Sequence, residues 1–394
     1  MSLNTIRDID VSGKRVLVRV DYNVPLKNGE VADATRIKAS LPTLEYLLEK
    51  GARLILMSHL GRPKGEASPE FSLAPVSKKL AELIDRRVTI APDCVGEEVE
   101  RMAEELKTGE ILMLENMRFH GEETKKDEAF AARLARLADV YVNDAFGSAH
   151  RAHASTEGVA HHLPAAAGFL IEKEVKFFTP LVTEPEQPFV AIIGGAKVSS
   201  KIGVLETLLP KCRTLIIGGG MAYTFLKEMG HSIGKSLYEE DYADTARDLL
   251  KQAEKAGVSI ILPTDHVVAQ EFSESAEPVA VDEVDIPDGM IGMDIGPKTI
   301  QSLAEAVRTA RSLVWNGPMG VFEFDAFAKG TLETARLVAE CEGTTVVGGG
   351  DSVAVVNAFG LEDSIDHVST GGGASLEFLE GKTLPGIAAL EKKE

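Results

Sequence analysis

Short apolar runs alternate with longer amphipathic stretches along the whole chain of 394 residues. The runs of the first half are "KRVLVRV", "ARLILMS", "EILMLE" and "DVYVND", and those of the second half are "FVAIIGG", "TLIIGGG", "SIILPTD", "SLVWNGP" and "TTVVGGG". This alternation is typical of βα units, in which helices cover a parallel sheet. The pattern therefore predicts an α/β protein with mainly parallel sheets in both halves.

The stretch "SLPTLEYLLEKG" carries a clear helical pattern. Leu44 and Leu47 fall on one face at helical spacing, as expected for a helix that packs on a sheet. Ser40 is the expected N-cap, Pro42 falls in the first turn, and Gly51 is expected to end the helix. We therefore predict a helix that begins after Ser40.

The stretch "GFLIEKEVKFFTPLVTEPEQPF" separates the two halves and combines a helical pattern with a connection that contains several prolines. Pro180, Pro185 and Pro188 are expected to end the helix, because a residue before proline is disfavoured in the helical conformation. We therefore predict two doubly wound (Rossmann-like) domains joined by a hinge helix. The predicted parts are residues 1–168, the hinge helix 169–184 and residues 185–376.

The composition agrees with two folded domains and disfavours some classes of binding partner. The 42 Lys and Arg against 61 Asp and Glu give a formal net charge of −19, and 44 % of the residues are hydrophobic. A chain of this length usually forms two domains, and its apolar content is too high for a disordered protein. Because cations supply most of the affinity for phosphate backbones, the acidic balance disfavours nucleic acid and anionic membranes as partners.

The cysteines and the first residues indicate a cytoplasmic protein. Cys94, Cys212 and Cys341 are far apart and form no CxxC pair, which favours free thiols in a reducing compartment over a disulfide framework or a zinc site. The opening "MSLNTIRDID" has no apolar leader region, and no later stretch reaches the length of a membrane span.

Cationic and polar side chains follow the predicted strands of the first half. In open α/β sheets, ligands bind beyond the carboxyl ends of the strands. Any one of these side chains could be a surface charge, and Arg19 could simply support its neighbours, but together they predict a site for an anion. Arginine suits that task because its planar fork binds phosphate or carboxylate oxygens in pairs. The residues are Arg19, Asp21, Asn23, Arg36, His59, Arg62, Arg118 and Arg151.

Two further histidines follow the last of these strands. His150 and His153 have no acidic or cysteine partner at a metal-binding spacing, so we interpret both as structural or peripheral.

Glycine-rich turns follow the strands of the second half, in "IIGGAKVSSK", "IIGGGMAYTF", "WNGPMGVFE", "VVGGGDSVAVV" and "STGGGASLEF". Glycine lets a ligand approach the main chain, where N–H groups at a helix start meet anionic oxygen. With Lys197 and Lys201 beside the first turn, the set predicts a polyphosphate or nucleotide site. The P-loop and the dinucleotide fingerprint are both absent, which disfavours P-loop NTPases and NAD-dependent dehydrogenases.

Two acidic residues lie near these turns. Asp351 stands at a predicted helix start, where a carboxylate would repel phosphate unless a divalent cation lay between them, so it is either a Mg²⁺ ligand or an N-cap. Glu323 either accepts hydrogen bonds from ribose hydroxyls or is a solvated acid. A pocket for a small anion and a nucleotide site with Mg²⁺ together predict phosphoryl transfer.

The strings "RVDYNVP", "SHLGRPKG", "DAFGSAHRAHAST", "GGAKVSSK", "WNGPMGVFE", "GGGDSVAVV" and "STGGGAS" closely resemble the motifs of the phosphoglycerate kinase family, in order and over nearly the whole chain. Val355 replaces an expected alanine, which is a mild departure. The resemblance implies a monomer, a first domain for 3-phosphoglycerate or 1,3-bisphosphoglycerate, a second for MgADP or MgATP, and closure about a hinge. It also implies that the last helix, residues 377–394, packs back on the first domain.

The resemblance implies a role for each matching residue. The substrate would be held by Asp21, Asn23, Arg36, His59, Arg62, Arg118 and Arg151. The nucleotide would be held by Lys197, Lys201, Gly292, Asn316, Pro318, Glu323, Gly350, Asp351, Ser352 and Val353, with Asp351 on Mg²⁺.

We expect in-line transfer of the acyl phosphate of 1,3-bisphosphoglycerate to ADP, a step of glycolysis. Both nucleophiles are ionised at neutral pH, so the reaction requires no general base and depends on positioning and charge stabilisation. The expected catalytic groups are Arg36 and Lys197, with the N–H groups around Gly372 and Gly373. An NAD-dependent oxidoreductase and a non-catalytic nucleotide-binding scaffold remain the alternatives.

Overall fold

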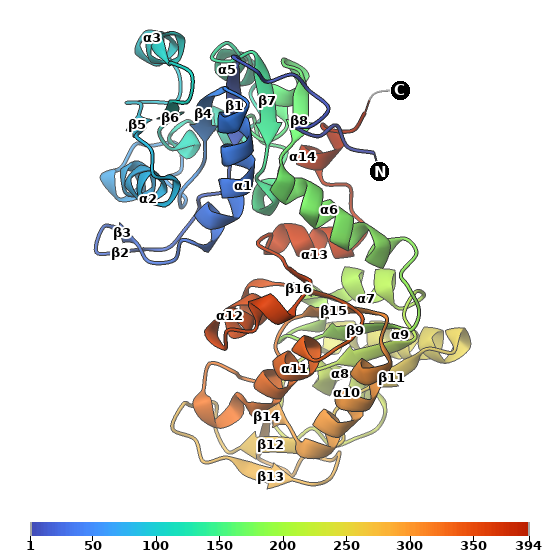
Figure 1. Ribbon diagram of the computed structural model, residues 1–394. Helices are drawn as coiled ribbons and strands as arrows, with labels where there is room; N and C mark the ends of the chain where they lie inside the picture. The colour runs from blue at the N-terminus through green and yellow to red at the C-terminus, as the bar shows by residue number, and fades with distance from the viewer. Residues whose placement is uncertain (1, 393–394) are drawn as a thin grey trace. The chain divides into compact units, whose positions relative to one another are not determined.

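The computed structural model describes residues 2–392. The chain divides into two compact units, of which unit 1 is Met1–Lys176 with Thr383–Glu394 and unit 2 is Phe177–Lys382. Each unit is built on its own six-stranded sheet with helices packed around it (Figure 1). Every apolar run that the sequence predicts as a strand forms one.

The sheet of unit 1 is entirely parallel, with the strand order β5-β6-β4-β1-β7-β8. The chain runs to one side of β1 first and to the other side afterwards, so the β1/β7 pair marks the switch point at which ligands bind in such sheets. The strands are β1 Arg15–Arg19, β4 Arg53–Met57, β5 Val88–Ile90, β6 Ile111–Met113, β7 Val140–Asn143 and β8 Ala165–Ala167, and a hairpin is formed by β2 Leu26–Lys27 and β3 Glu30–Val31.

Helices pack on this sheet and form its core, in which Val16 and Val18 of β1 share a cluster with Leu44 and Leu47 of α1. The helices are α1 Thr35–Glu49, α2 Ala74–Ile84, α3 Glu97–Glu105, α4 Gly121–Thr124, α5 Glu128–Ala135 and α14 Pro385–Ala388, and α6 Phe169–Val182 begins in unit 1 and ends in unit 2. The 3₁₀ turns are Pro69–Phe71, Met117–Phe119, Phe146–Ser148 and Gly158–His161.

The predicted start of α1 is wrong. The helix begins at Thr35, whose backbone N–H donates to Oδ1 of Asp33 at 2.8 Å, and it continues through Pro42. Ser40 therefore lies inside the helix, where its hydroxyl donates to the carbonyl oxygen of Ile37. The predicted end agrees, because Gly51 adopts a positive φ just after the helix.

Unit 2 contains a second parallel sheet, in the order β11-β10-β9-β15-β16-β17, with its switch point between β9 and β15. An antiparallel sheet, β13-β12-β14, is added to it and was absent from the sequence-based prediction. The strands are β9 Phe189–Ile193, β10 Thr214–Ile217, β11 Ser259–Ile261, β12 His266–Ala269, β13 Val279–Val281, β14 Ile291–Ile295, β15 Ser312–Asn316, β16 Thr344–Gly348 and β17 His367–Val368.

The helices of unit 2 follow its strands in the expected alternation. They are α7 Ile202–Leu208, α8 Ala222–Glu228, α9 Ala243–Ala256, α10 Pro297–Thr309, α11 Lys329–Ala339, α12 Gly350–Ala358 and α13 Gly373–Leu379. The 3₁₀ turns are Val198–Ser200, Glu240–Tyr242, Asp325–Phe327 and Glu362–Ser364.

Two segments differ in detail from the sequence-based prediction. Pro180 lies inside α6 and does not end it. The segment expected as one helix over 377–394 instead ends α13 at Leu379 and forms the separate short helix α14, because Gly381 at φ +72° and Pro385 interrupt the helical path. Residues 393–394 lie outside the described part of the chain.

Candidate active site

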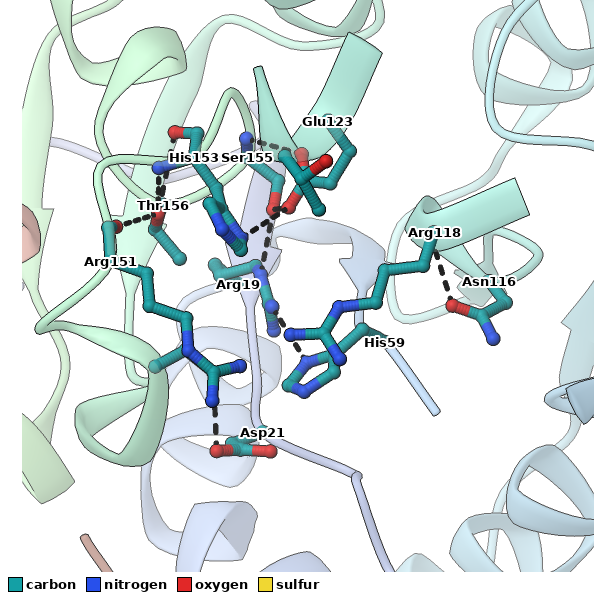
Figure 2. A network of polar contacts seen from close by, with 12 residues as sticks. Arg19, Asp21, His59, Asn116, Arg118, Glu123, Arg151, His153, Ser155 and Thr156 are labelled. Carbon is teal, nitrogen blue, oxygen red and sulfur yellow. Dashed lines mark hydrogen bonds and ion pairs between the residues drawn. The ribbon is translucent and has the colours of Figure 1, made fainter. Parts of the chain in front are cut away.

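The polar residues that follow β1, β4 and β7 meet at the switch point of unit 1 (Figure 2). Asp21 follows β1 and His59 follows β4. Arg118 lies in the turn Met117–Phe119, and Arg151 comes after the turn Phe146–Ser148. Figure 2 shows these side chains pointing toward a common centre. The expected convergence of side chains at this edge of the sheet is therefore observed.

An ion pair joins the strand end to the first turn of α1. Nη1 of Arg36 donates to Oδ1 of Asp21 at 3.1 Å and to the carbonyl oxygen of Asn23 at 3.3 Å. Burial opposes ionisation of Asp21, but the charges of its neighbours, including Arg36 and Arg19, outweigh it and bring its pKa to about 2. Asp21 is therefore a carboxylate at any physiological pH and holds Arg36 in place.

Unit 1 also contains a pocket of about 540 Å³. We call it the cationic pocket, because guanidinium and ammonium groups line it and, among residues 2–392, no carboxylate does. Arg62 is exposed on its wall, and the side chain of Asn23 accepts the backbone N–H of Gly61 at 2.9 Å. Its lining residues are Arg62, Lys64, Gly65, Arg118, His120, Gly121, Thr124, Lys125, Arg151 and His153.

Burial and neighbouring charges shift the pKa values of two basic side chains of unit 1. Burial, followed by the charges of Arg151 and Arg19, lowers the pKa of Arg118 to about 10, which still leaves it charged. Arg118 also has a buried Nε without a hydrogen-bond partner in the described structure. Burial holds the pKa of His59 well below its usual range, against the attraction of Asp21. The region thus combines charged guanidinium groups with a neutral imidazole.

At the switch point of unit 2, two glycine turns pack against each other. Gly317 follows β15 with φ +95°, and a Cβ there would overlap the carbonyl oxygen of Gly194, which follows β9. The backbone N–H of Gly317 also donates to Oγ of Ser352 in α12 at 2.6 Å. Ser352 therefore links the turn after β15 to the helix that follows β16.

A second pocket, of about 260 Å³, lies beside these turns, and we call it the glycine-lined pocket. One wall is bare backbone, and the other is apolar and includes Leu237 and Phe272. A flat apolar base and a string of phosphates would each find a matching wall there. Its lining residues are Gly195, Ala196, Gly219, Gly220, Tyr223, Leu237, Phe272, Ile291, Gly292, Met293, Pro318, Met319, Gly320, Val321, Glu323 and Asp351.

Charged groups stand at one side of the glycine-lined pocket. Lys201 donates from Nζ to Oδ1 of the buried Asn316, whose Nδ2 has no hydrogen-bond partner within residues 2–392. Burial lowers the pKa of Lys201, while Asp351 and Glu380 act in the opposite direction. The N-cap interpretation of Asp351 is wrong, because Gly349 occupies the N-cap of α12 and the described structure shows no side-chain capping bond there.

Comparisons with known proteins agree with this arrangement. A family model described as "Phosphoglycerate kinase" matches residues 6–382. The chain is 59% identical to a phosphoglycerate kinase of Borrelia hermsii over 392 residues and 60% identical to that of Moorella thermoacetica over 393, with 100% of both chains covered in each case. The solved structure of phosphoglycerate kinase from Coxiella burnetii superposes with a TM-score of 0.90 at 42% identity and covers 98% of both chains.

The chain belongs to the phosphoglycerate kinase family. It is therefore a kinase and a transferase of glycolysis, as the motifs predict, and the alternative of an NAD-dependent oxidoreductase is excluded. The two-domain α/β fold with mainly parallel sheets is likewise confirmed, and it is shared with the phosphoglycerate kinase of Pyrococcus horikoshii at a TM-score of 0.85 and 33% identity, over 98% of both chains.

The residues predicted from the family motifs fall into the two units as follows. Arg62, Arg118 and Arg151 line the cationic pocket, and Asp21, Asn23, Arg36 and His59 lie at the strand ends of the same unit. Gly292, Pro318, Glu323 and Asp351 line the glycine-lined pocket. Lys197, Lys201, Asn316, Gly350, Ser352, Val353, Gly372 and Gly373 also belong to unit 2 without lining that pocket. Their roles as phosphoglycerate kinase site residues stay predictions.

Sequence reasoning missed several residues of these pockets. Lys64 and Lys125 join the cationic pocket from loops, and His153, interpreted as structural or peripheral, lines its wall. The apolar wall of the other pocket includes Phe272, which lies in the connection between β12 and β13 and follows no predicted strand. The sequence did offer a signal for the two lysines, which stand within "GRPKG" and after "GEET". It offered no signal for Phe272.

Cys94 and Cys212 are buried and Cys341 is partly buried, and all of them are free thiols. Within the described range 2–392, no helix has the length and apolar character needed to cross a membrane.

Proposed function

We propose that the chain transfers the acyl phosphate of 1,3-bisphosphoglycerate to ADP, giving 3-phosphoglycerate and ATP reversibly, with the nucleotide bound as its Mg²⁺ complex. One observation carries this proposal beyond family membership. Each unit has a pocket suited to a phosphorylated ligand close to the switch point of its own sheet, and the two pockets differ in chemistry. A cationic pocket suits a small polyanion, and a pocket with bare backbone and an apolar wall suits a nucleotide.

On the glycerate side, guanidinium groups supply most of the binding. Arg62, Arg118 and Arg151 would hold phosphate and carboxylate oxygens by charge-assisted hydrogen bonds. Asp21 would accept a hydrogen bond from the hydroxyl group of the glycerate, the amide of Asn23 would accept or donate one, and His59 would donate one from its ring. The ion pair with Asp21 supports a fixed orientation of Arg36 before the substrate arrives.

On the nucleotide side, the residues present fit a magnesium nucleotide. Asp351 is an exposed carboxylate in the first turn of α12, where backbone N–H groups attract phosphate and an acid alone would repel it. Carboxylate and phosphate oxygens are the ligands that Mg²⁺ prefers. Asp351 would hold the ion, which neutralises phosphate charge when bound. Lys201, Gly350, Ser352 and Val353 would surround the phosphates, and Glu323 the ribose.

Catalysis would rest on charge stabilisation and positioning. The attacking oxygens of ADP and of the glycerate carboxylate are ionised at neutral pH, so no side chain need remove a proton. Arg36 and Lys197 would neutralise the phosphoryl group during transfer, assisted by the backbone N–H groups around Gly372 and Gly373. Lys197 has an exposed side chain in the turn after β9, which leaves it available for that contact.

Further parts of the proposal concern the whole chain. Transfer of an acyl phosphate requires that water be excluded, so we expect the domains predicted as residues 1–168 and 185–376 to close on their ligands about the hinge helix 169–184. Scattering that shows no compaction with both ligands bound would contradict this closure. The protein is proposed to act as a cytoplasmic monomer, which sedimentation at working concentration would test.

A coupled assay tests the proposed reaction directly. ATP formation from ADP and 1,3-bisphosphoglycerate is measured with and without added Mg²⁺, and we expect turnover only with the ion. Turnover that persists after chelation of divalent cations would overturn the Mg²⁺ proposal. ADP binding without any turnover would favour the alternative of a non-catalytic scaffold.

A further inference from the structure

Arg19 lies at the centre of a buried polar network in unit 1 (Figure 2). Only 1% of the residue is exposed. Its Nε donates to Oγ of Ser155 at 2.8 Å, its Nη1 donates to the carbonyl oxygen of Val20, and its Nη2 lies 3.0 Å from Nδ1 of His59. All of these partners are groups of the protein itself, which agrees with the interpretation of Arg19 as a supporting residue.

The contact with Arg19 determines which nitrogen of His59 carries the proton. A guanidinium group has donors only, so Nδ1 of His59 must be the acceptor and is unprotonated. Burial, against the attraction of Asp21, keeps the pKa of His59 well below its usual range, so the ring is neutral. Its single proton then lies on Nε2, which can donate to an oxygen of the glycerate. The other tautomer would present a lone pair there and repel that oxygen.

Ser155 connects Arg19 to a buried acid. Its hydroxyl donates to Oε1 of Glu123 at 2.6 Å, and its backbone N–H donates to Oε2 at 2.9 Å. A hydroxyl has one proton, and because Ser155 gives it to Glu123, its lone pairs face the Nε–H of Arg19. Arg19 therefore donates on both sides, to Nδ1 of His59 on one side and to Ser155 on the other, and Ser155 in turn donates to Glu123.

Glu123 lies in α4 and is fully buried. A buried carboxylate is costly unless it is hydrogen-bonded and near a cation. His153 does not supply that cation, although its Nδ1 lies 3.7 Å from Oε1, because burial lowers the pKa of His153 to about 4. Both partners from Ser155 are donors, so only a group with two acceptor oxygens satisfies them. The guanidinium of Arg118 interacts electrostatically with Glu123, and that of Arg19 is linked to Glu123 through Ser155.

We propose that Glu123 and Ser155 are positioning residues of the glycerate site, which act through Arg19 to hold His59 as an Nε2–H donor. This inference rests on the proposed function and deepens it, since it explains how one substrate-binding group obtains its hydrogen-bonding character. Neither Glu123 nor Ser155 is among the residues that line the cationic pocket. Their effect on the substrate is therefore indirect.

Kinetics of two variants test the positioning role. Glu123→Gln places an NH₂ group against one of two donors, and Ser155→Ala removes the acceptor of Arg19 Nε. In each variant we expect the KM for 3-phosphoglycerate to rise about tenfold, the effect of one charge-assisted hydrogen bond, while the KM for ATP stays within about twofold. Equal rises in both KM values, or none in either variant, would overturn the proposal.

Ser40→Ala provides the matched control. It removes another buried hydroxyl of unit 1, whose Oγ lies 2.8 Å from the hydroxyl of Tyr22 and which is not part of the Arg19 network. We expect it to lower thermal stability without raising the KM for 3-phosphoglycerate. If Ser40→Ala raised that KM as much as Ser155→Ala does, the effect would be a general loss of packing and the proposal would fail.

Nitrogen-15 NMR of the His59 ring tests the inference independently of activity. The wild-type protein should show His59 protonated on Nε2 alone, and Ser155→Ala should shift the ring toward a mixture of tautomers. Protonation on Nδ1 in the wild type, or an unchanged ring in Ser155→Ala, would overturn the proposal even if the enzyme were active. Absence of kinase activity with the expected ring signals would instead contradict the proposed function and leave the network in place.

Discussion

Nη1 of Arg36 lies 3.1 Å from Oδ1 of Asp21. The arginine belongs to the first turn of α1 and the aspartate follows β1, so this ion pair fixes a helix start against the edge of the sheet. The Arg36 side chain remains 31% exposed, whereas that of Asp21 is 8% exposed. The buried acid therefore orients a cation whose guanidinium is still available to a ligand.

Replacement of Arg36 should remove transition-state stabilisation. We expect Arg36→Ala to lower kcat by about 100- to 1000-fold, and Arg36→Lys by less, because the ammonium keeps the charge and loses the planar fork. Steady-state kinetics in both directions would measure this. Arg15→Ala is the control, since Arg15 pairs with Asp139 at the other end of β1 and should leave kcat unchanged. A kcat near that of the wild type would show the assignment of Arg36 to be wrong.

Lys197 should matter in the same kinetic step. Lys197→Ala is expected to lower kcat by roughly 100-fold while thermal stability stays the same, because the side chain is exposed and its loss leaves no cavity. Pre-steady-state measurement of the transfer step would check this. Retention of the wild-type transfer rate would remove Lys197 from the catalytic set.

The magnesium proposal predicts a specific phenotype for Asp351→Asn. We expect the Mg²⁺ concentration needed for half-maximal activity to rise at least about tenfold, while the KM for 3-phosphoglycerate stays unchanged. Fluorescence of Trp315 offers a binding readout, because its indole Nε1 donates to the carbonyl oxygen of Gly317 in the turn beside the glycine-lined pocket. An unchanged Mg²⁺ requirement would contradict the role of Asp351.

Substitution by alanine should affect two glycines of unit 2 differently, one through stability and the other through ADP binding. Gly317→Ala adds a Cβ against the carbonyl oxygen of Gly194 at φ +95°, so we expect a loss of about 2 kcal/mol or more in the free energy of unfolding. Gly350→Ala meets no described atom within 4 Å and should leave stability unchanged while weakening ADP binding. Urea unfolding and nucleotide titration would measure the pair, and equal stabilities would contradict the packing argument.

Asp144 should make the stability of unit 1 depend on pH. Its Oδ1 accepts the backbone N–H of Leu170 at 2.9 Å, while Oδ2 is buried with no partner in the described structure. Burial raises the pKa of Asp144 to about 7, against its usual 3.8. A carboxyl group with a raised folded pKa contributes stability that is fully present below pH 3.8 and is lost as the pH rises through about 7.

Asp144→Asn removes this titration. Between pH 5 and pH 8 we expect the wild type to lose roughly 1 to 3 kcal/mol of unfolding free energy relative to the variant. Urea unfolding followed by circular dichroism at both pH values would measure the difference. A difference that does not change with pH would show that Asp144 does not titrate as its environment indicates.

Much of the fold follows from local patterns because the strands of a parallel sheet are buried on both faces. Val16 and Ile192 therefore lie in apolar runs that are easy to find. The strand at Ala165–Ala167 was missed because alanine has little preference for strands and only pairing with Tyr141 and its neighbours defines it. The position of Ser40 was predicted wrongly because a serine hydroxyl can find a hydrogen-bond partner inside a helix as well as at the start of one.

The pocket-lining residues were predictable where they lie in the loop or helix start that follows a parallel strand, as Arg62 does after β4 and Asp351 after β16. Glu123 was not, because an acid within "GEET" resembles a solvated surface residue and its burial results from tertiary packing. Phe272 was missed for a related reason, since it reaches the glycine-lined pocket from a loop outside the parallel sheet. Supporting and apolar residues carry no local signature, whereas cations that follow the strands of a parallel sheet do.

Residues near the end of the chain complete unit 1. Nδ2 of Asn143 donates to the carbonyl oxygen of Gly386 at 3.2 Å, and the backbone N–H of Asn4 donates to that of Leu390 at 2.9 Å. A ribosome therefore delivers all of unit 2 before these contacts can form. The first unit to emerge is the last whose hydrogen bonds are complete, so nascent unit 1 lacks the partner of Asn143, at the end of β7, until the rest of the chain has emerged.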